Sequence, residues 1–227
     1  MVDGYPVDGR SEFRNRRIAV HECGHALVSR ALGDSVWSLT IIPGGGFEGR
    51  CIRSGPPSEL TLAENGPGKT EEIRSICERL ERIAPELGST RVALSEYIIR
   101  SQNNVVELLA GEAAELILHP DLPSLGAVHD FVEADAFAKV AVAVRPATMA
   151  LLEYCRSEAS GLLTENRDIL DALIAALIAK GTLSGDEIDA IIAGCITVRS
   201  AKAEGARRQD WERRSVSAAT FAGISER

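Results

Sequence analysis

The chain has 227 residues, of which 45% are hydrophobic and 4% aromatic, and its formal net charge is −8. A net acidic chain with few aromatic side chains argues against nucleic-acid binding, which needs cations for phosphate and rings for base stacking. No stretch approaches the roughly 18 to 20 uncharged apolar residues of a membrane helix, and residues 1–16 lack the apolar core of a signal peptide. Five cysteines at irregular spacing form no disulfide framework. We therefore expect a cytoplasmic protein without membrane contact.

The first predicted element is a helix around His21-Glu22-Cys23-Gly24-His25, which lies between apolar residues 18–20 and 26–28. Residues four apart lie one above the other on a helix, so both imidazoles share one face. Two such histidines can bind one zinc ion, and Glu22 can then reach the zinc-bound water. The alternative is an ordinary polar stripe. Against it, two of the chain's four histidines lie here, beside residues that would bury them.

The next elements are short. Residues 38–42 and 49–52 predict a small sheet beside the helix, whose edge could pair with an extended polypeptide. Residues 64–70 end like a phosphate-binding loop, but Ala63 stands where the loop needs a glycine, so a helix start is the better interpretation. The apolar spacing of residues 71–87 predicts a helix that could be a lid, a docking surface or a packing element.

The second half of the chain predicts helices at 104–118, 127–144, 147–158, 165–179 and 186–193, separated by proline and glycine residues. Beyond Thr197 the chain is polar, and we expect a flexible tail with a short helix around Trp211. A catalytic zinc ion needs a third protein ligand. His119, His129 and several carboxylates are candidates, and spacing alone does not choose between them.

Four blocks of the sequence, taken in order, resemble a known family. Residues 19–49 look like the protease domain of the FtsH-type ATP-dependent zinc proteases, whose signature is a His-Glu-x-Gly-His helix, a Thr-Ile-Ile-Pro strand and a glycine-rich turn. Residues 108–118, 126–140 and 162–192 resemble later segments of the same domain. The likeness covers roughly residues 17–194 and is weak between about 55 and 104.

The resemblance assigns a role to individual residues. It implies that His21, His25 and Asp130 are zinc ligands and that Glu22 is the general base. His129 stands where the family usually has a small polar residue. A position at the surface, or a hydrogen bond to one of the metal-binding side chains, is therefore favoured over direct binding of the metal by His129. Glu115 matches an acidic position near the family's site, although an ordinary salt bridge is an equally good interpretation.

Together these features predict a mainly α (α+β) fold: a helical zinc-metallopeptidase domain with a small β-sheet near the active site and a C-terminal helical bundle. We expect an N-terminal extension at 1–16, a peptidase domain at 17–197 with a divergent insert at about 55–104, and a tail at 198–227. The insert's role and the tail's role stay open.

The predicted function is that of a zinc-dependent metalloendopeptidase acting on unfolded or extended polypeptides. The family carries a membrane anchor and an ATPase module, neither of which is recognisable here, so we expect no ATPase of its own and consider a separate ATPase partner. Hexamer formation is implied by the family alone. The alternatives are a non-catalytic regulatory or adaptor protein that retains the fold, and a zinc amidohydrolase acting on a small substrate.

Overall fold

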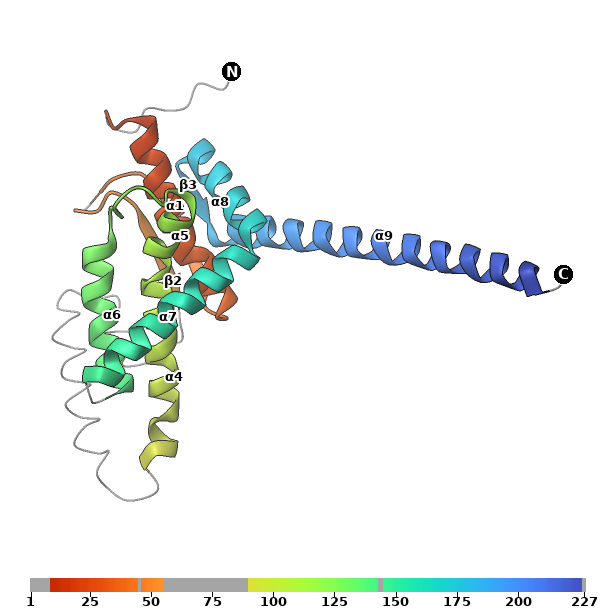
Figure 1. The fold of residues 1–227 in the computed structure, drawn as a ribbon. Helices are drawn as coiled ribbons and strands as arrows, with labels where there is room; N and C mark the ends of the chain where they lie inside the picture. The colour runs from red at the N-terminus through yellow and green to blue at the C-terminus, as the bar shows by residue number, and fades with distance from the viewer. Residues whose placement is uncertain (1–8, 45, 55–89, 143–144, 226–227) are drawn as a thin grey trace. The chain divides into compact units, whose positions relative to one another are not determined.

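The computed structural model describes residues 9–44, 46–54, 90–142 and 145–225 (Figure 1). Residues 55–89 lie outside the described part, and with them the predicted helix at 71–87 and the glycine-rich segment at 64–70. The chain divides into two compact units, Met1–Ile188 and Asp189–Arg227, and each is described by itself.

The first unit is mostly helical and contains a three-stranded sheet, which confirms the predicted fold class. Its elements in chain order are α1 (Glu12–Ala31), β1 (Ser35–Thr40), β2 (Arg50–Ser54), α4 (Thr90–Leu108), α5 (Ala110–Leu118), α6 (Ala127–Ala141), α7 (Arg145–Glu165), α8 (Arg167–Lys180) and β3 (Thr182–Ser184), followed by the start of α9 (Gly185–Ser225).

Helix α1 is the centre of this unit. Ser11 caps its first turn by accepting a hydrogen bond from the backbone N–H of Arg14 at 3.2 Å. The apolar residues on both sides of the histidine motif are buried, and α1 packs against α5, α8 and the sheet. At Gly24 the approach of α5 is so close that a Cβ would lie 2.6 Å from the carbonyl oxygen of Ala110. The motif is therefore held in the packed core, where side chains have little freedom.

The sheet has the order β2-β1-β3, and both pairings are antiparallel. Leu39 is at the centre, opposite Cys51 on one side and Leu183 on the other. The register of β1 against β2 shifts between Val36 and Ser38, as in a β-bulge. Since β1 is the central strand, β2 presents an outer edge of the described sheet.

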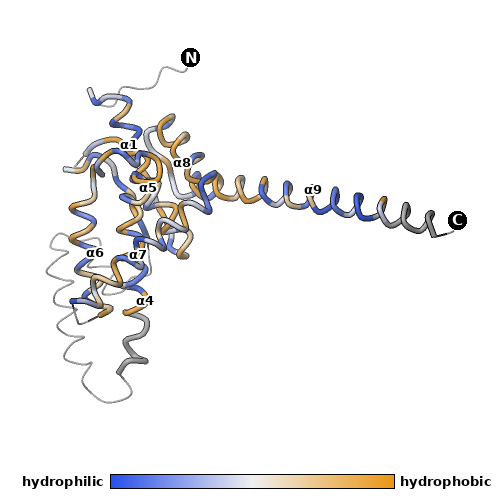
Figure 2. The backbone as a smooth tube through the Cα atoms, in the orientation of Figure 1, coloured by the Kyte–Doolittle hydropathy of each residue, from blue (hydrophilic) through white to orange (hydrophobic). Residues whose placement is uncertain are grey.

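The helices differ from prediction mainly at their ends. The helix expected at 104–118 is the end of α4 followed by α5, with the break at Leu109. Helix α7 begins before the expected 147 because Pro146 fits the first turn, where a helix needs no backbone N–H. Helix α8 ends at Lys180, and Gly181, whose φ is 77°, caps it in the left-handed conformation. Figure 2 shows how apolar α8 is, and its buried face includes Leu170, Leu173 and Leu177.

The second unit is the greater part of α9, whose first residues belong to the first unit. Ser184 and Glu187 form a capping box, with the Glu187 carboxylate accepting from the Ser184 N–H at 2.8 Å. The helix continues to Ser225, far beyond the predicted end at 193, and includes Trp211. Glu204 and Asp210 pair with arginines three and four residues later, which supports the helix where Figure 2 shows it to be hydrophilic. The flexibility of 198–227 stays a prediction. None of the described helices is long and apolar enough to cross a membrane.

Candidate metal centre

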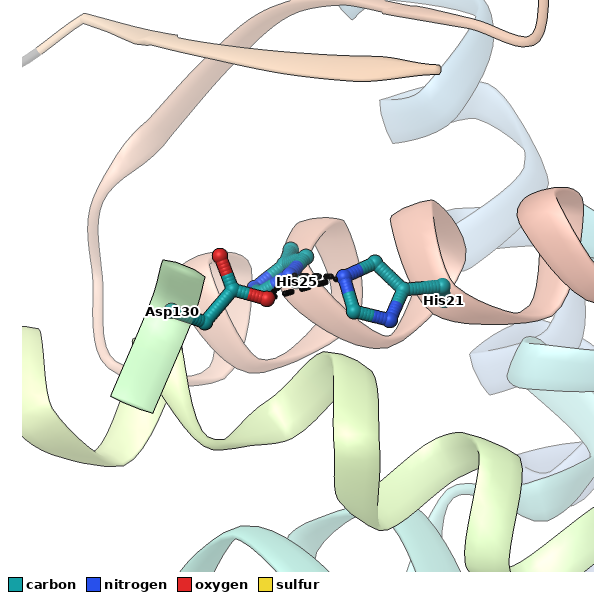
Figure 3. Close-up of side chains that lie close together, drawn as sticks. All are labelled: His21, His25 and Asp130. Atoms are coloured by element: carbon teal, nitrogen blue, oxygen red, sulfur yellow. Dashed lines mark hydrogen bonds and ion pairs between the residues drawn. The ribbon is translucent and has the colours of Figure 1, made fainter. Parts of the chain in front are cut away.

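Three side chains from two helices converge on one point (Figure 3). His21 and His25 project from α1, and Asp130 projects from the first turn of α6. The Nε2 atom of His21 lies 3.0 Å from Nε2 of His25 and 3.0 Å from Oδ2 of Asp130, while His25 Nε2 lies 3.5 Å from the same oxygen. We call His21, His25 and Asp130 the candidate metal centre. The structure thus brings together the three residues that the family resemblance implies are zinc ligands.

The donor atoms of the candidate metal centre fit a zinc ion. The Nδ1 atom of His25 lies 2.8 Å from the backbone carbonyl oxygen of Glu107. A carbonyl only accepts hydrogen bonds, so Nδ1 carries the proton and Nε2 has a lone pair. Nδ1 of His21 lies 2.9 Å from the carboxylate of Glu115 and is oriented in the same way. Tetrahedral zinc with ligands at about 2.0–2.1 Å separates them by about 3.3–3.4 Å, close to the spacing observed.

The charge state of the cluster points the same way. Among the described residues, no N–H or O–H group donates to the buried Oδ2 of Asp130. Burial lowers the pKa of His25, but the nearby carboxylates of Asp130 and Glu107 outweigh burial and hold the pKa well above its usual value. Burial raises the pKa of Asp130, yet the two histidines more than offset this and leave the pKa well below its usual range. The cluster therefore favours a positive charge at its centre, which a proton or a metal ion can supply.

Glu22 lies beside the candidate metal centre and faces a cleft. The cleft has a volume of about 520 Å³, and its lining includes Glu22, Asp130, Phe47 and Leu125. Burial raises the pKa of Glu22 above its usual value. The backbone at Gly49 passes directly over this carboxylate, since a Cβ there would lie 2.8 Å from its Oε1 atom. A carboxylate with a raised pKa in a cleft is suited to proton transfer near neutral pH.

One wall of the cleft is held by residues that the sequence placed in an N-terminal extension. Arg10 donates to the carbonyl oxygens of Glu48 and Ile41 at 2.9 and 2.5 Å. Arg14 contacts both carboxylate oxygens of Glu48, at 2.5 and 3.3 Å. These arginines tie the loop before β2 to the start of α1, a role that no motif around them indicates.

Glu115 is buried and is the meeting point of four groups. It accepts from Arg17 at 2.5 Å, from Ser124 Oγ at 2.9 Å and from the backbone N–H of Leu125 at 3.2 Å, in addition to its contact with His21. Burial raises its pKa, but these donors outweigh burial and lower the pKa to about 2. Both interpretations of the sequence apply here, because the carboxylate forms a salt bridge and also orients a histidine of the candidate metal centre.

The other two histidines lie apart from the three converging donors. His129 lines the rim of the cleft, but its side chain is 83% exposed and lies 3.2 Å from Glu133. The ring of His119 packs against Phe13, with their centroids 5.9 Å apart.

A second buried carboxylate, on Glu107, was missed by sequence reasoning. Its Oε1 atom lies 3.3 Å from Nδ1 of His25, and its Oε2 atom lies 3.1 Å from Arg53 on β2. A sequence signal existed: Glu107 interrupts the apolar run formed by residues 105, 106, 108 and 109, and a charge in such a run is usually paired. The partner is distant in sequence, so only the fold reveals it.

Two glycines let the backbone close on the histidines. A Cβ at Gly111 on α5 would lie 2.5 Å from both Cε1 of His21 and Nε2 of His25. A Cβ at Gly126, just before α6, would lie 2.6 Å from Cε1 of His21. Neither position accommodates a side chain without displacing the imidazoles.

A His-Glu-x-x-His helix whose imidazoles meet a carboxylate from another helix is typical of zinc metallopeptidases. No protein-family model matches the chain. It is 28% identical over 183 residues to the ATP-dependent zinc metalloprotease FtsH 2 of Symbiobacterium thermophilum. The matched region covers 78% of this chain and 30% of that protein. It is 30% identical over 216 residues to the ATP-dependent zinc metalloprotease FtsH of Methylibium petroleiphilum, covering 87% of this chain and 33% of the relative.

The FtsH 4 protease of Sorangium cellulosum is 27% identical over 196 residues, covering 81% of this chain and 30% of that protein. The chain is therefore a homologue of the FtsH-type zinc metalloproteases, which confirms the resemblance seen in the sequence. It spans about a third of the length of these relatives.

Proposed function

We propose that the chain is a zinc-dependent metalloendopeptidase that hydrolyses peptide bonds in unfolded or extended polypeptides. The observation that carries this proposal is the convergence of His21, His25 and Asp130 within 3.0–3.5 Å, next to a cleft that Glu22 faces. His21, His25 and Asp130 would hold the zinc ion. Three protein ligands leave the fourth coordination position of a tetrahedral zinc ion open, as in catalytic zinc sites.

Zinc bound there would supply Lewis-acid polarisation and lower the pKa of a water molecule. Glu22 accepts the proton of the attacking water at its carboxylate and returns it to the nitrogen of the leaving amine. Its raised pKa brings both transfers closer to neutral pH. Glu115 and the carbonyl of Glu107 keep the two Nδ1 protons in place and so orient the imidazoles.

A polypeptide substrate is supported by the position of β2. This strand begins at Arg50, directly after Gly49, which lines the cleft. Its outer edge can form main-chain hydrogen bonds with an extended chain and deliver a peptide bond to the cleft without regard to sequence. A folded protein has few such segments, so unfolded chains are the expected substrates.

Two alternatives remain distinct. A regulatory or adaptor protein with this fold would not require Glu22 in the cleft, and a small-molecule amidohydrolase would not require the strand edge. The names of the relatives state ATP dependence, so a separate ATPase partner and a homo-oligomeric ring are further proposals, as is a cytoplasmic location.

The test is hydrolysis of casein by the zinc-loaded protein without ATP, beside Glu22→Gln. We expect cleavage by the wild type and a loss of at least about 100-fold in the variant, with equal zinc content in both. Cleavage that survives in Glu22→Gln would refute the assignment of the base. Zinc binding without any cleavage would favour a protease that depends on a partner, or the adaptor alternative.

A further inference from the structure

Glu107 and Arg53 form a buried ion pair that touches the candidate metal centre from the side of the sheet. Glu107, at the end of α4, is 4% exposed. Arg53 comes from β2, and its Nη1 atom lies 3.1 Å from Glu107 Oε2 and 3.3 Å from Oδ1 of Asn104 on α4. A buried ion pair often stabilises a folded protein no more than apolar residues of the same size would. Stability alone therefore does not explain why this pair is present.

The geometry at His25 provides that use. The Nδ1 atom of His25 faces Glu107 twice, at 2.8 Å from its backbone carbonyl oxygen and at 3.3 Å from its carboxylate. The carbonyl fixes the position of the Nδ1 proton, and the carboxylate adds negative charge beside it. That charge makes Nε2, the atom that faces the candidate metal centre, more basic and so a stronger electron-pair donor to a metal ion.

The same contacts connect the centre to a strand. Arg53 stands on β2 opposite Val36, at the point where the register of β1 and β2 shifts. A bulge changes the direction of neighbouring side chains, and here the side chain of Arg53 reaches the carboxylate on α4 and is only 14% exposed. The chain of contacts therefore runs from β2 through Arg53 and Glu107 to His25.

We infer that Arg53 and Glu107 are positioning residues that set the orientation and donor strength of His25 and link the edge strand β2 to the metal centre. This inference rests on the proposed function, because it assumes that a metal binds at His21, His25 and Asp130. It extends that proposal by adding a route between the strand that would hold the substrate and one of the ligands.

The experiment measures zinc affinity by competition with a chromogenic chelator, and the visible spectrum of the Co²⁺-loaded protein. In Glu107→Gln the backbone carbonyl still holds the Nδ1 proton, so the change isolates the carboxylate charge. We expect zinc affinity to fall by about 10-fold or more and the Co²⁺ bands to shift. Arg53→Met should act in the same direction, and Arg53→Lys should recover part of the loss because it keeps the charge.

The matched control is Arg100→Met. Arg100 also belongs to a partly buried ion pair involving α4, with its Nη1 atom 3.0 Å from Asp34 Oδ1, but this pair does not contact the candidate metal centre. Its variant should keep wild-type zinc affinity and the wild-type spectrum. If Glu107→Gln leaves a charge too costly to bury, the double variant with Arg53→Met removes both charges and should still show the weaker site.

Hydrogen exchange measures the reverse effect, that of zinc binding on strand β2. Coupling between two sites is reciprocal, so zinc should slow exchange of the amides in β2 of the wild type, and this protection should be lost in Arg53→Met. Wild-type affinity, spectrum and β2 protection in the folded variants would overturn the inference and leave the proposed function intact. A wild type that binds neither Zn²⁺ nor Co²⁺ would overturn both.

Discussion

Replacing Gly111 by alanine tests how closely α5 approaches the candidate metal centre. A Cβ at this position would lie 2.5 Å from atoms of both histidines, whereas ordinary van der Waals contact begins at 3.4 Å. The imidazoles and α5 must therefore separate by about 0.9 Å, the difference between these two distances. In a well-formed zinc site the ligand distances stay within about 0.2 Å of their usual values. We expect zinc affinity to fall by about 10- to 100-fold, as when contacts that orient a ligand are lost.

The stability of the metal-free variant should change much less. Alanine favours a helix over glycine by about 1 kcal/mol, while an extra methyl group in a packed core costs about 1–3 kcal/mol. The two effects leave a destabilisation of at most about 2 kcal/mol. Gly161 on α7 is the matched control, because a Cβ there would meet no atom within 4 Å.

Chelator competition measures the zinc affinity, and urea unfolding in EDTA measures the stability. Gly161→Ala should be as stable as the wild type or up to about 1 kcal/mol more stable, with unchanged zinc affinity. A folded Gly111→Ala protein that binds zinc as tightly as the wild type would show that α5 does not confine the two imidazoles, and the reasoning would fail.

Three further changes separate the parts of the site. Asp130→Ala should lower zinc affinity by far more than a loss of packing explains, and zinc retained at full affinity in direct titrations would refute its role as a ligand. Gly49→Ala places a methyl group 2.8 Å from the Glu22 carboxylate, so it should reduce kcat for casein and leave zinc affinity unchanged; the reverse outcome would contradict the placement of Glu22. In the metal-free protein, Glu115 has a pKa lowered from 4.5 to about 2, so its contribution to stability is present above about pH 4.5 and is lost as the pH falls through 2. Urea unfolding of Glu115→Gln should show a flatter profile in this range, and an unchanged slope would argue against the carboxylate's role.

The parts of the site that lie in one local pattern were predictable. His21, Glu22 and His25 belong to one helix, and the helical period alone places the two imidazoles together. Asp130 was assigned through family resemblance, because nothing in the spacing of a chain specifies which distant residue meets a given helix. The structure brings it to 3.0 Å from His21, which agrees with that assignment.

The remaining contacts depend on tertiary packing. Arg10 and Arg14 looked like part of a polar extension, yet they hold the loop that forms a wall of the cleft. Arg53 and Glu107 are 54 residues apart, and their pairing requires that the fold bring the side chain of a β2 residue to the end of α4. Similarly, the length of α9 was underestimated because its residues after Thr197 are polar, whereas ion pairs three and four residues apart support such a helix without a buried face.

The position of Asp130 has a consequence for the whole folded chain. His25 and Asp130 are separated by 105 residues, so a zinc ion bound to both would tie two distant parts of the first unit together in the native state only. A ligand that binds only the native state adds about 1.4 kcal/mol of stability for each tenfold rise in its free concentration above Kd. The supply of zinc would then determine how long the folded protein survives proteolysis in the cell, in addition to whether it can cleave a substrate.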